Sequence, residues 1–163
     1  MTTVGPVADG GDEFARPRIA SGVLYFDGAD RVMLVEPTYK ALWDIPGGYV
    51  QPGERPAATL REVIEEFGAR LPVGALLVVD WAPHPAEGNK LLFVFDGGQL
   101  SPRQIAAVRV DGTEIGEFAF RGREELDGLL IPRLARRVHA AIEARAAGRA
   151  AYLEQRAAQP VGA

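Results

Sequence analysis

The sequence contains no cysteine, which excludes disulfide-stabilised scaffolds, thiolate metal sites and cysteine nucleophiles together. It also lacks any apolar run near the roughly 20 residues that a membrane-spanning helix needs. The first 13 residues have neither a basic start nor an apolar stretch, so they do not resemble a secretory signal. We therefore expect a cytoplasmic protein with no membrane partner.

Basic side chains are fewer than acidic ones, 18 against 22, and the formal net charge is −4. A general nucleic-acid binder usually shows a basic excess, so we expect no nucleic-acid partner. The 163 residues are 47% hydrophobic and 25% charged, which is the size and balance of one globular domain.

The predicted elements mix strands and helices without a regular strand–helix–strand order and without an internal repeat. Strands are expected over 19–26, 32–35, 42–45, 49–51, 75–82, 90–95 and 114–120, with Asp96-Gly97-Gly98 as a closing turn. Helices are expected over 56–67, 124–130 and 132–147. The pattern predicts an α/β (α+β) fold with helices packed on a mixed β-sheet. Residues 1–16 are expected to be a flexible tail, 17–147 the domain, and 148–163 an extension that is weakly helical or disordered.

The predicted helix over 56–67 has two chemically different faces. Its apolar stripe, spaced i, i+3, i+4 and i+7, consists of Leu60, Val63, Ile64 and Phe67. Away from that stripe, Glu62, Glu65 and Glu66 repel one another and lie toward the helix end whose dipole disfavours anions. A hard cation such as Mg²⁺ would offset both costs. A solvated acidic face is the alternative that this spacing alone leaves open.

Two glycine turns lie just before this helix, Pro46-Gly47-Gly48 and Pro52-Gly53-Glu54. Glycine permits a positive φ angle and a close approach of the backbone to a ligand. Two such turns leading directly into an acidic helix favour a binding site over a plain surface.

These segments together resemble the signature of the Nudix hydrolases: Gly, five residues, Glu, seven residues, then Arg-Glu, an aliphatic residue, any residue, Glu-Glu, any residue and Gly. The chain reads Gly48 to Glu54, then Arg55 to Leu60, then Arg61-Glu62-Val63-Ile64-Glu65-Glu66-Phe67-Gly68. The order of elements over about residues 18–147 also resembles the Nudix α/β/α sandwich.

One departure is that six residues, not seven, separate Glu54 from Arg61. If the helix shifted by one residue to make up this difference, its apolar stripe would turn by about 100° away from the core. We therefore expect the loop around Glu54 to absorb the difference while the three glutamates of the helix keep their place.

The resemblance implies hydrolysis of a diphosphate linkage in a small-molecule substrate, most often a nucleotide or nucleoside diphosphate derivative. It implies that Glu62, Glu65 and Glu66 bind Mg²⁺ or Mn²⁺, that Arg61 orients a carboxylate by ion pairing, and that Gly47 and Gly48 shape the backbone at the substrate. The general base stays open among Glu65, Glu62, Glu114 and Glu117.

Substrate recognition is expected from aromatic and basic side chains near the glycine turns. Trp81 is a candidate for stacking on a base, with core packing as the equal alternative, whereas packing is favoured for Trp43. Lys40 is a candidate phosphate ligand. Two further hypotheses stay open. The protein could be a Nudix-fold nucleotide-binding or regulatory module without turnover, or an unrelated protein with a solvated acidic helix. A homodimer is also open, because dimers are common among Nudix proteins.

Overall fold

The structure, a computed structural model, describes residues 14–155 of the chain. Most of the expected tail, and residues 156–163, therefore lie outside the described residues. The elements in chain order are β1 Arg18–Phe26, β2 Val32–Pro37, β3 Gly47–Tyr49, α1 Pro56–Glu65, β4 Leu76–Trp81, β5 Lys90–Gln99, α2 Pro102–Ala107, β6 Ile115–Arg121, the 3₁₀ helix η2 Arg123–Glu125, α3 Leu126–Leu129, α4 Pro132–Ala147 and β7 Ala151–Glu154.

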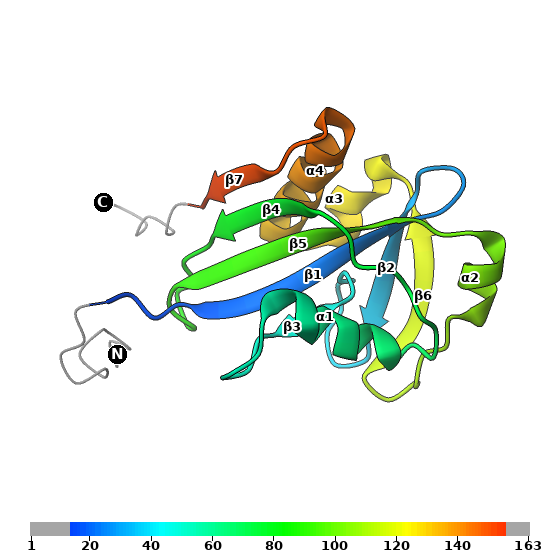
Figure 1. The fold of residues 1–163 in the computed structure, drawn as a ribbon, viewed down its shortest axis with the longest axis horizontal. Coiled ribbons are helices and arrows are strands. Elements are labelled where there is room, and N and C mark those ends of the chain that lie inside the picture. The colour runs from blue at the N-terminus through cyan, green and yellow to red at the C-terminus, as the bar shows by residue number, and fades with distance from the viewer. Residues whose placement is uncertain (1–13, 156–163) are drawn as a thin grey trace.

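One mixed sheet of seven strands organises the molecule (Figure 1). Its strand order is β6-β2-β1-β5-β4-β7, and β3 pairs with β1 beside that path. The pairs β1–β5 and β4–β7 are parallel, and the remaining pairs are antiparallel. The mixed sheet predicted from the sequence is confirmed.

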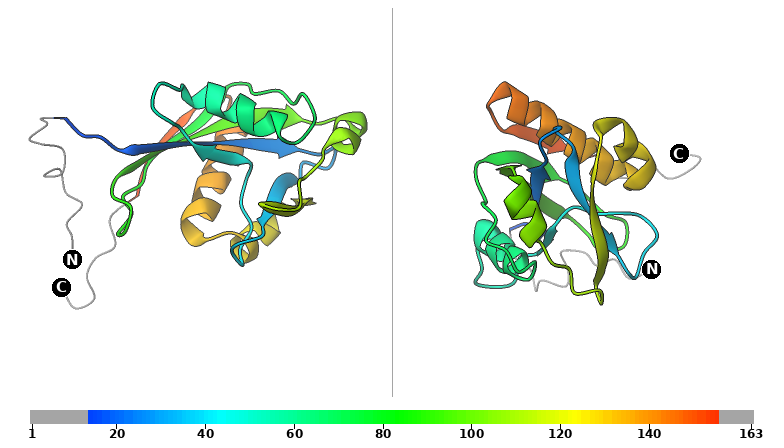
Figure 2. Two further views of the ribbon diagram at one scale, coloured as in Figure 1. Left: turned by 90° about the horizontal axis from the view of Figure 1, so that it is seen from below. Right: turned by 90° about the vertical axis from the view of Figure 1, so that its right-hand side faces the viewer.

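Helices cover both faces of this sheet, as the turned views show (Figure 2). On one face, α1 packs into a core that includes Val23 and Tyr25 of β1. On the other face, α3 and α4 pack into a second core that includes Leu24 and Phe26 of the same strand. Successive residues of a strand point to opposite faces, so β1 serves both cores. The result is the predicted α/β/α sandwich.

Helix α1 lies with its apolar stripe against the sheet. Leu60, Ile64 and Phe67 are 0%, 2% and 3% exposed, and Val63 packs beside them. Burial at about 1.5–3 kcal/mol per side chain holds this register, so the predicted orientation is confirmed despite the shorter loop. Regular α-helix stops at Glu65, two residues earlier than expected, because the backbone N–H groups of residues 66–68 bond three residues back.

Helix α4 has the predicted bounds, but the chain beyond it does not continue as helix. Gly148 adopts a left-handed conformation, φ 70°, and ends α4. Residues 151–154 then form strand β7, which pairs with β4 in parallel. The weak helical extension expected at Tyr152 and Leu153 is therefore wrong, because pairing with an open sheet edge satisfies this backbone instead.

The segment after β5 also differs from the expectation. Asp96-Gly97-Gly98 does not end the strand; β5 continues to Gln99 through an irregularity in its pairing with β1. The next helix, α2, was not predicted, although Ser101 and Gln104 form a capping box, a signal visible in the sequence. No helix among residues 14–155 is long and apolar enough to cross a membrane.

Candidate active site

The acidic end of α1, defined as Glu62, Glu65 and Glu66, is exposed. Glu65 is the last helical residue and Glu66 is the C-cap. Three carboxylates therefore lie where the free carbonyl groups of the helix already concentrate negative charge. Within residues 14–155 none of the three carboxylates has a hydrogen bond or ion pair. No cationic side chain among residues 14–155 therefore neutralises the negative charge of these three glutamates.

The chemistry of this donor set fits a hard divalent cation, which takes carboxylate oxygens and keeps several waters. As they stand, however, the side chains do not converge: no group of three Asp, Glu or His side chains in the described part is placed to hold a metal ion. Arg61 is exposed and forms no ion pair within the described residues, so the expected orienting pair is absent. Metal binding would require the free carboxylates to rotate toward a shared ion.

Gly47 and Gly48 bring three elements close together. A Cβ at Gly47 would lie 2.3 Å from the carbonyl oxygen of Ser21, so β3 can approach β1 only with glycine at this position. A Cβ at Gly48 would lie 3.4 Å from Cγ2 of Val63 on α1. Neither glycine has a positive φ; Gly53, with φ 86°, does. Gly47 thus permits the close approach of β3 to β1, whereas a Cβ at Gly48 would make only an ordinary contact with α1. Neither glycine has the turn geometry expected from the sequence.

A cavity of about 430 Å³ lies on the α4 side of the sheet, within the usual size range of ligand sites. Its walls come from β1, residues 39–49, β5 and the start of α4. We call it the basic pocket because four cationic side chains line it: Lys40, Lys90, Arg133 and Arg137. Trp43, Tyr39 and Tyr49 add aromatic surface, and Gly47 and Gly48 border it. Strand β3 therefore touches both α1 and the basic pocket.

Hydrogen bonds hold the cations of the basic pocket in place. Lys40 Nζ lies 2.8 Å from Asp44 Oδ2, and Lys90 pairs with Glu87 while lying over the Tyr49 ring. The hydrogen bond from Lys90 lowers the pKa of the Glu87 carboxyl. These cations are therefore fixed before a ligand arrives, unlike the free carboxylates of α1.

The two arginines of the pocket differ in their partners. Arg137 Nε donates to Asp80 Oδ2 at 2.7 Å, and both residues are buried. Arg133 donates to Gln155 Oε1 at 2.9 Å and to the backbone oxygen of Pro83. Both acceptors of Arg133 are neutral. In the part of the chain that is described, its positive charge has no carboxylate partner.

The structure brings Lys40, Gly47 and Gly48 to one pocket, but it does not bring Trp81 there. Asp80, next to it in β4, is buried against Arg137 of α4. Neighbouring strand residues point to opposite faces, so Trp81 points away from the basic pocket. Trp43, for which packing was favoured, lines the pocket and also packs against the α4-side core.

Glu117 is an exposed residue of β6. Its neighbours Phe118 and Phe120 pack against the α1-side core. Alternation along the strand therefore points Glu117 to the other face, where it pairs in register with Glu36. As one of the four candidates for the general base, Glu117 therefore lies on the face of the sheet opposite to α1.

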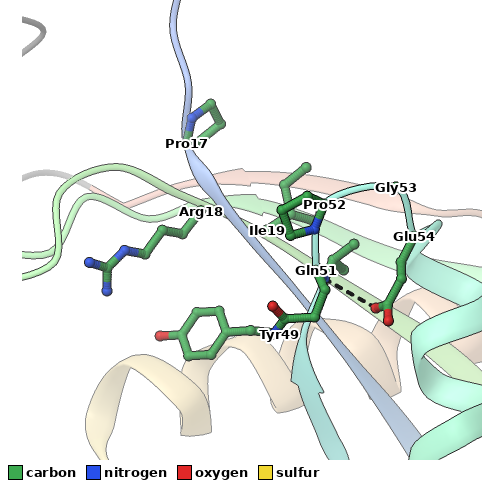
Figure 3. A pocket seen from close by; sticks show the side chains of 9 residues that line it. Pro17, Arg18, Ile19, Tyr49, Gln51, Pro52, Gly53 and Glu54 are labelled. Carbon is green, nitrogen blue, oxygen red and sulfur yellow. Dashed lines mark hydrogen bonds between the residues drawn. The ribbon is translucent and has the colours of Figure 1, made fainter. Parts of the chain in front are cut away.

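A second, more open hollow of about 560 Å³ lies between the start of β1 and the loop that follows β3 (Figure 3). Arg18 is the one cation among its lining residues. Glu54 braces the loop here, since its Oε2 accepts the backbone N–H of Gln51 at 3.1 Å and the Thr59 hydroxyl at 2.8 Å. These bonds, the Gln51 one first, lower the pKa of Glu54. This hollow offers far less positive charge than the basic pocket.

Arg133 and Arg137 were missed from the sequence. They lie at i and i+4 on α4, a spacing that places both on one side of the predicted helix. A further signal was Asp80, one charge in an otherwise apolar strand, since a buried carboxylate requires a partner. What the sequence did not reveal is which element supplies that partner.

Comparison with known proteins gives one consistent result. The family model described as NUDIX domain matches residues 16–143. A Bacillus subtilis (strain 168) protein named "Putative 8-oxo-dGTP diphosphatase" is 29% identical over 118 residues, covering 72% of this chain and 74% of that protein.

Solved structures have the same fold. A UDP-X diphosphatase superposes with a TM-score of 0.71 at 21% identity, covering 90% of this chain and 73% of that one. An ADP-ribose pyrophosphatase from Streptococcus suis 89-1591 superposes with a TM-score of 0.64 at 14% identity, covering 86% and 100%. At such identities the likeness shows the fold.

Proposed function

Because this chain belongs to the Nudix hydrolase family, we propose that it hydrolyses the diphosphate linkage of a nucleoside diphosphate derivative with the help of a divalent metal ion. The observation that carries the proposal is the pairing of two oppositely charged regions: the free carboxylates of α1 and the cations of the basic pocket, with β3 in contact with both. A nucleotide diphosphate carries the aromatic and anionic groups that these regions complement.

The basic pocket supplies recognition in this proposal. Lys40, Lys90 and Arg133 offer charge to phosphate oxygens, and Trp43 offers a flat apolar surface for a base or sugar. Because hydrogen bonds already hold these cations, little conformational entropy is lost when the substrate binds. The pocket would bind the nucleotide and aim its diphosphate along β3.

The acidic end of α1 supplies the chemistry. Glu62, Glu65 and Glu66 would hold Mg²⁺ or Mn²⁺, which when bound neutralises phosphate charge and makes water more acidic. Hydrolysis adds water across one phosphorus–oxygen–phosphorus bridge and yields two phosphorylated products. We assign acceptance of the water proton to Glu62 or Glu65, the two candidates on α1 itself. Glu117 points to the other side of the sheet, and Glu114 lies before β6, where its backbone oxygen accepts from Thr38.

Support for nucleotide substrates comes from the relatives, whose names refer to 8-oxo-dGTP, UDP-X and ADP-ribose. We propose a substrate of this class. The test is a screen of 8-oxo-dGTP, dGTP, ADP-ribose and UDP-glucose with Mg²⁺ and with Mn²⁺, in which products are separated by chromatography. Release of the expected nucleoside monophosphate supports the proposal. Nucleotide binding without turnover of any substrate would instead indicate a binding module.

A further inference from the structure

Gln155, the last residue that the structure describes, is buried although it is polar and follows an edge strand. It is 4% exposed. Its backbone N–H donates to the Trp81 carbonyl oxygen at 2.8 Å, one step beyond the parallel pairing of β7 with β4. This bond directs the side chain inward, under the start of α4.

Both polar atoms of the Gln155 side-chain amide form hydrogen bonds. Nε2 donates to Asp80 Oδ2 at 2.6 Å, and Oε1 accepts from Arg133 Nε at 2.9 Å. The reverse orientation would place an amide NH₂ against a guanidinium and an oxygen against a carboxylate, so the partners define one arrangement. Gln155 is thus a neutral bridge between a buried anion and a cation of the basic pocket.

The charges around this bridge do not cancel. Asp80 carries one negative charge and bonds Arg137 directly, so Arg133 remains as surplus positive charge. Burial lowers the pKa of Arg137; Asp80 opposes this effect, and the nearby charge of Arg133 adds to it. Two guanidinium groups that repel each other stay together only while other groups hold each in place. For Arg133 those groups are Gln155 and the backbone oxygen of Pro83.

We propose that Gln155 is a positioning residue for substrate binding: it holds Arg133 in the basic pocket so that the guanidinium can receive an anionic group, a phosphate oxygen of the nucleotide. The residue lies outside the NUDIX match at 16–143. Strand β7 and Gln155 therefore support the basic pocket from outside the segment that the family model matches. This inference rests on the proposed function.

Gln155→Leu removes the side-chain hydrogen bonds at similar volume and tests the proposal. We expect KM for the nucleotide turned over in the screen to rise about tenfold, equivalent to about 1.4 kcal/mol, with kcat changed less than about twofold, because a pocket contact and not the reacting centre is disturbed. Calorimetry of the same nucleotide in EDTA should show a matching rise in Kd. Tyr152→Ala, on the exposed face of β7, is the matched control and should leave KM unchanged.

A double-mutant cycle separates positioning from general stability. If Gln155 acts through Arg133, Gln155→Leu should add little to the KM of Arg133→Ala, because the group it positions is already absent. Should Gln155→Leu fail to fold, Gln155→Asn takes its place: its amide stays polar but is one methylene too short to reach Arg133 and Asp80 together, and KM should rise again.

Normal KM in a folded Gln155→Leu variant, or in Gln155→Asn, would overturn the inference while leaving the hydrolase function standing. Additive effects of Gln155→Leu and Arg133→Ala would also overturn it, because Gln155 would then act by another route. If the wild-type protein turned over no nucleotide in the screen, the proposed function would fail first, and the inference with it.

Discussion

The acidic end of α1 and the basic pocket differ in how their charges are held. The three glutamates come from five consecutive residues, are exposed, and have no partner within residues 14–155. The four cations come from three segments far apart in the chain, and each is held by a hydrogen bond or ion pair. Free carboxylates can turn toward a metal ion, whereas fixed cations are prepared for a ligand of definite shape. The contrast suggests that chemistry and recognition are separated between the two regions.

Removing the divalent metal ion should separate the two regions most clearly, and it has the largest expected effect. EDTA should reduce turnover by at least about a thousandfold, because metal charge stabilisation is worth several kcal/mol and each 1.36 kcal/mol is tenfold in rate. Nucleotide binding to the basic pocket should weaken far less. Kinetics before and after restoring Mg²⁺ or Mn²⁺, beside calorimetry in EDTA, measures both. Full activity in chelator would remove the metal from the proposal.

Glu65→Gln and Glu66→Gln should each lower kcat by about a hundredfold or more, the scale of removing a charge-stabilising group. Thermal stability should be unchanged or slightly higher, because each substitution relieves like-charge repulsion on α1. Steady-state kinetics at saturating metal and thermal melting provide the readouts. A variant that keeps half the wild-type rate would show that its carboxylate is outside the site.

Trp43→Leu and Trp81→Leu compare the two sides of the sheet. Trp43 lines the basic pocket, so its loss should raise KM about tenfold, within the 1–3 kcal/mol typical of base stacking on an aromatic ring. Trp81 points to the opposite face, and its loss should leave KM within about twofold. Equal effects on KM, measured beside melting temperatures, would contradict this placement.

Glu54→Gln should have the smallest effect, less than about tenfold in kcat, below the range of a core charge-stabilising group. One oxygen of Glu54 accepts both hydrogen bonds, and the amide oxygen of glutamine can replace it. The same variant serves as the matched control for Glu66→Gln. Equal damage from the two would mean that Glu54 also acts at the site.

The lowered pKa of Glu54 gives this variant a pH signature. Its ionised form stabilises the fold above the ordinary value of 4.5, and this contribution is lost as the pH falls through the lowered folded-state pKa. The wild-type advantage in melting temperature over Glu54→Gln should therefore be present at pH 7 and disappear in strong acid. A constant difference across this range would show that ionisation of Glu54 does not stabilise the loop.

Much of the architecture was predictable because its signals are local. The mixed sheet, the bounds of α4 and the orientation of α1 followed from hydrophobic period and from turn and cap residues. Strand β7 was missed because four residues beside a glycine cannot show which sheet edge is open. The continuation of β5 past Asp96 was missed because a turn-like Gly-Gly pair is held in the strand by its parallel neighbour β1.

For the site, the sequence by itself determined the acidic end of α1, since a helix fixes the spacing of residues three and four apart wherever it packs. Only the tertiary structure decided which face Trp81 and Glu117 occupy, and it alone assembled the basic pocket. The physical reason is register: strand partners far apart in the chain set which residues share a face, and a shift of one residue reverses every side chain. Asp80 and Gln155 meet through the pairing of β4 with β7, and Arg133 joins them because α4 packs on these strands. Their contact could therefore not be predicted from any one segment.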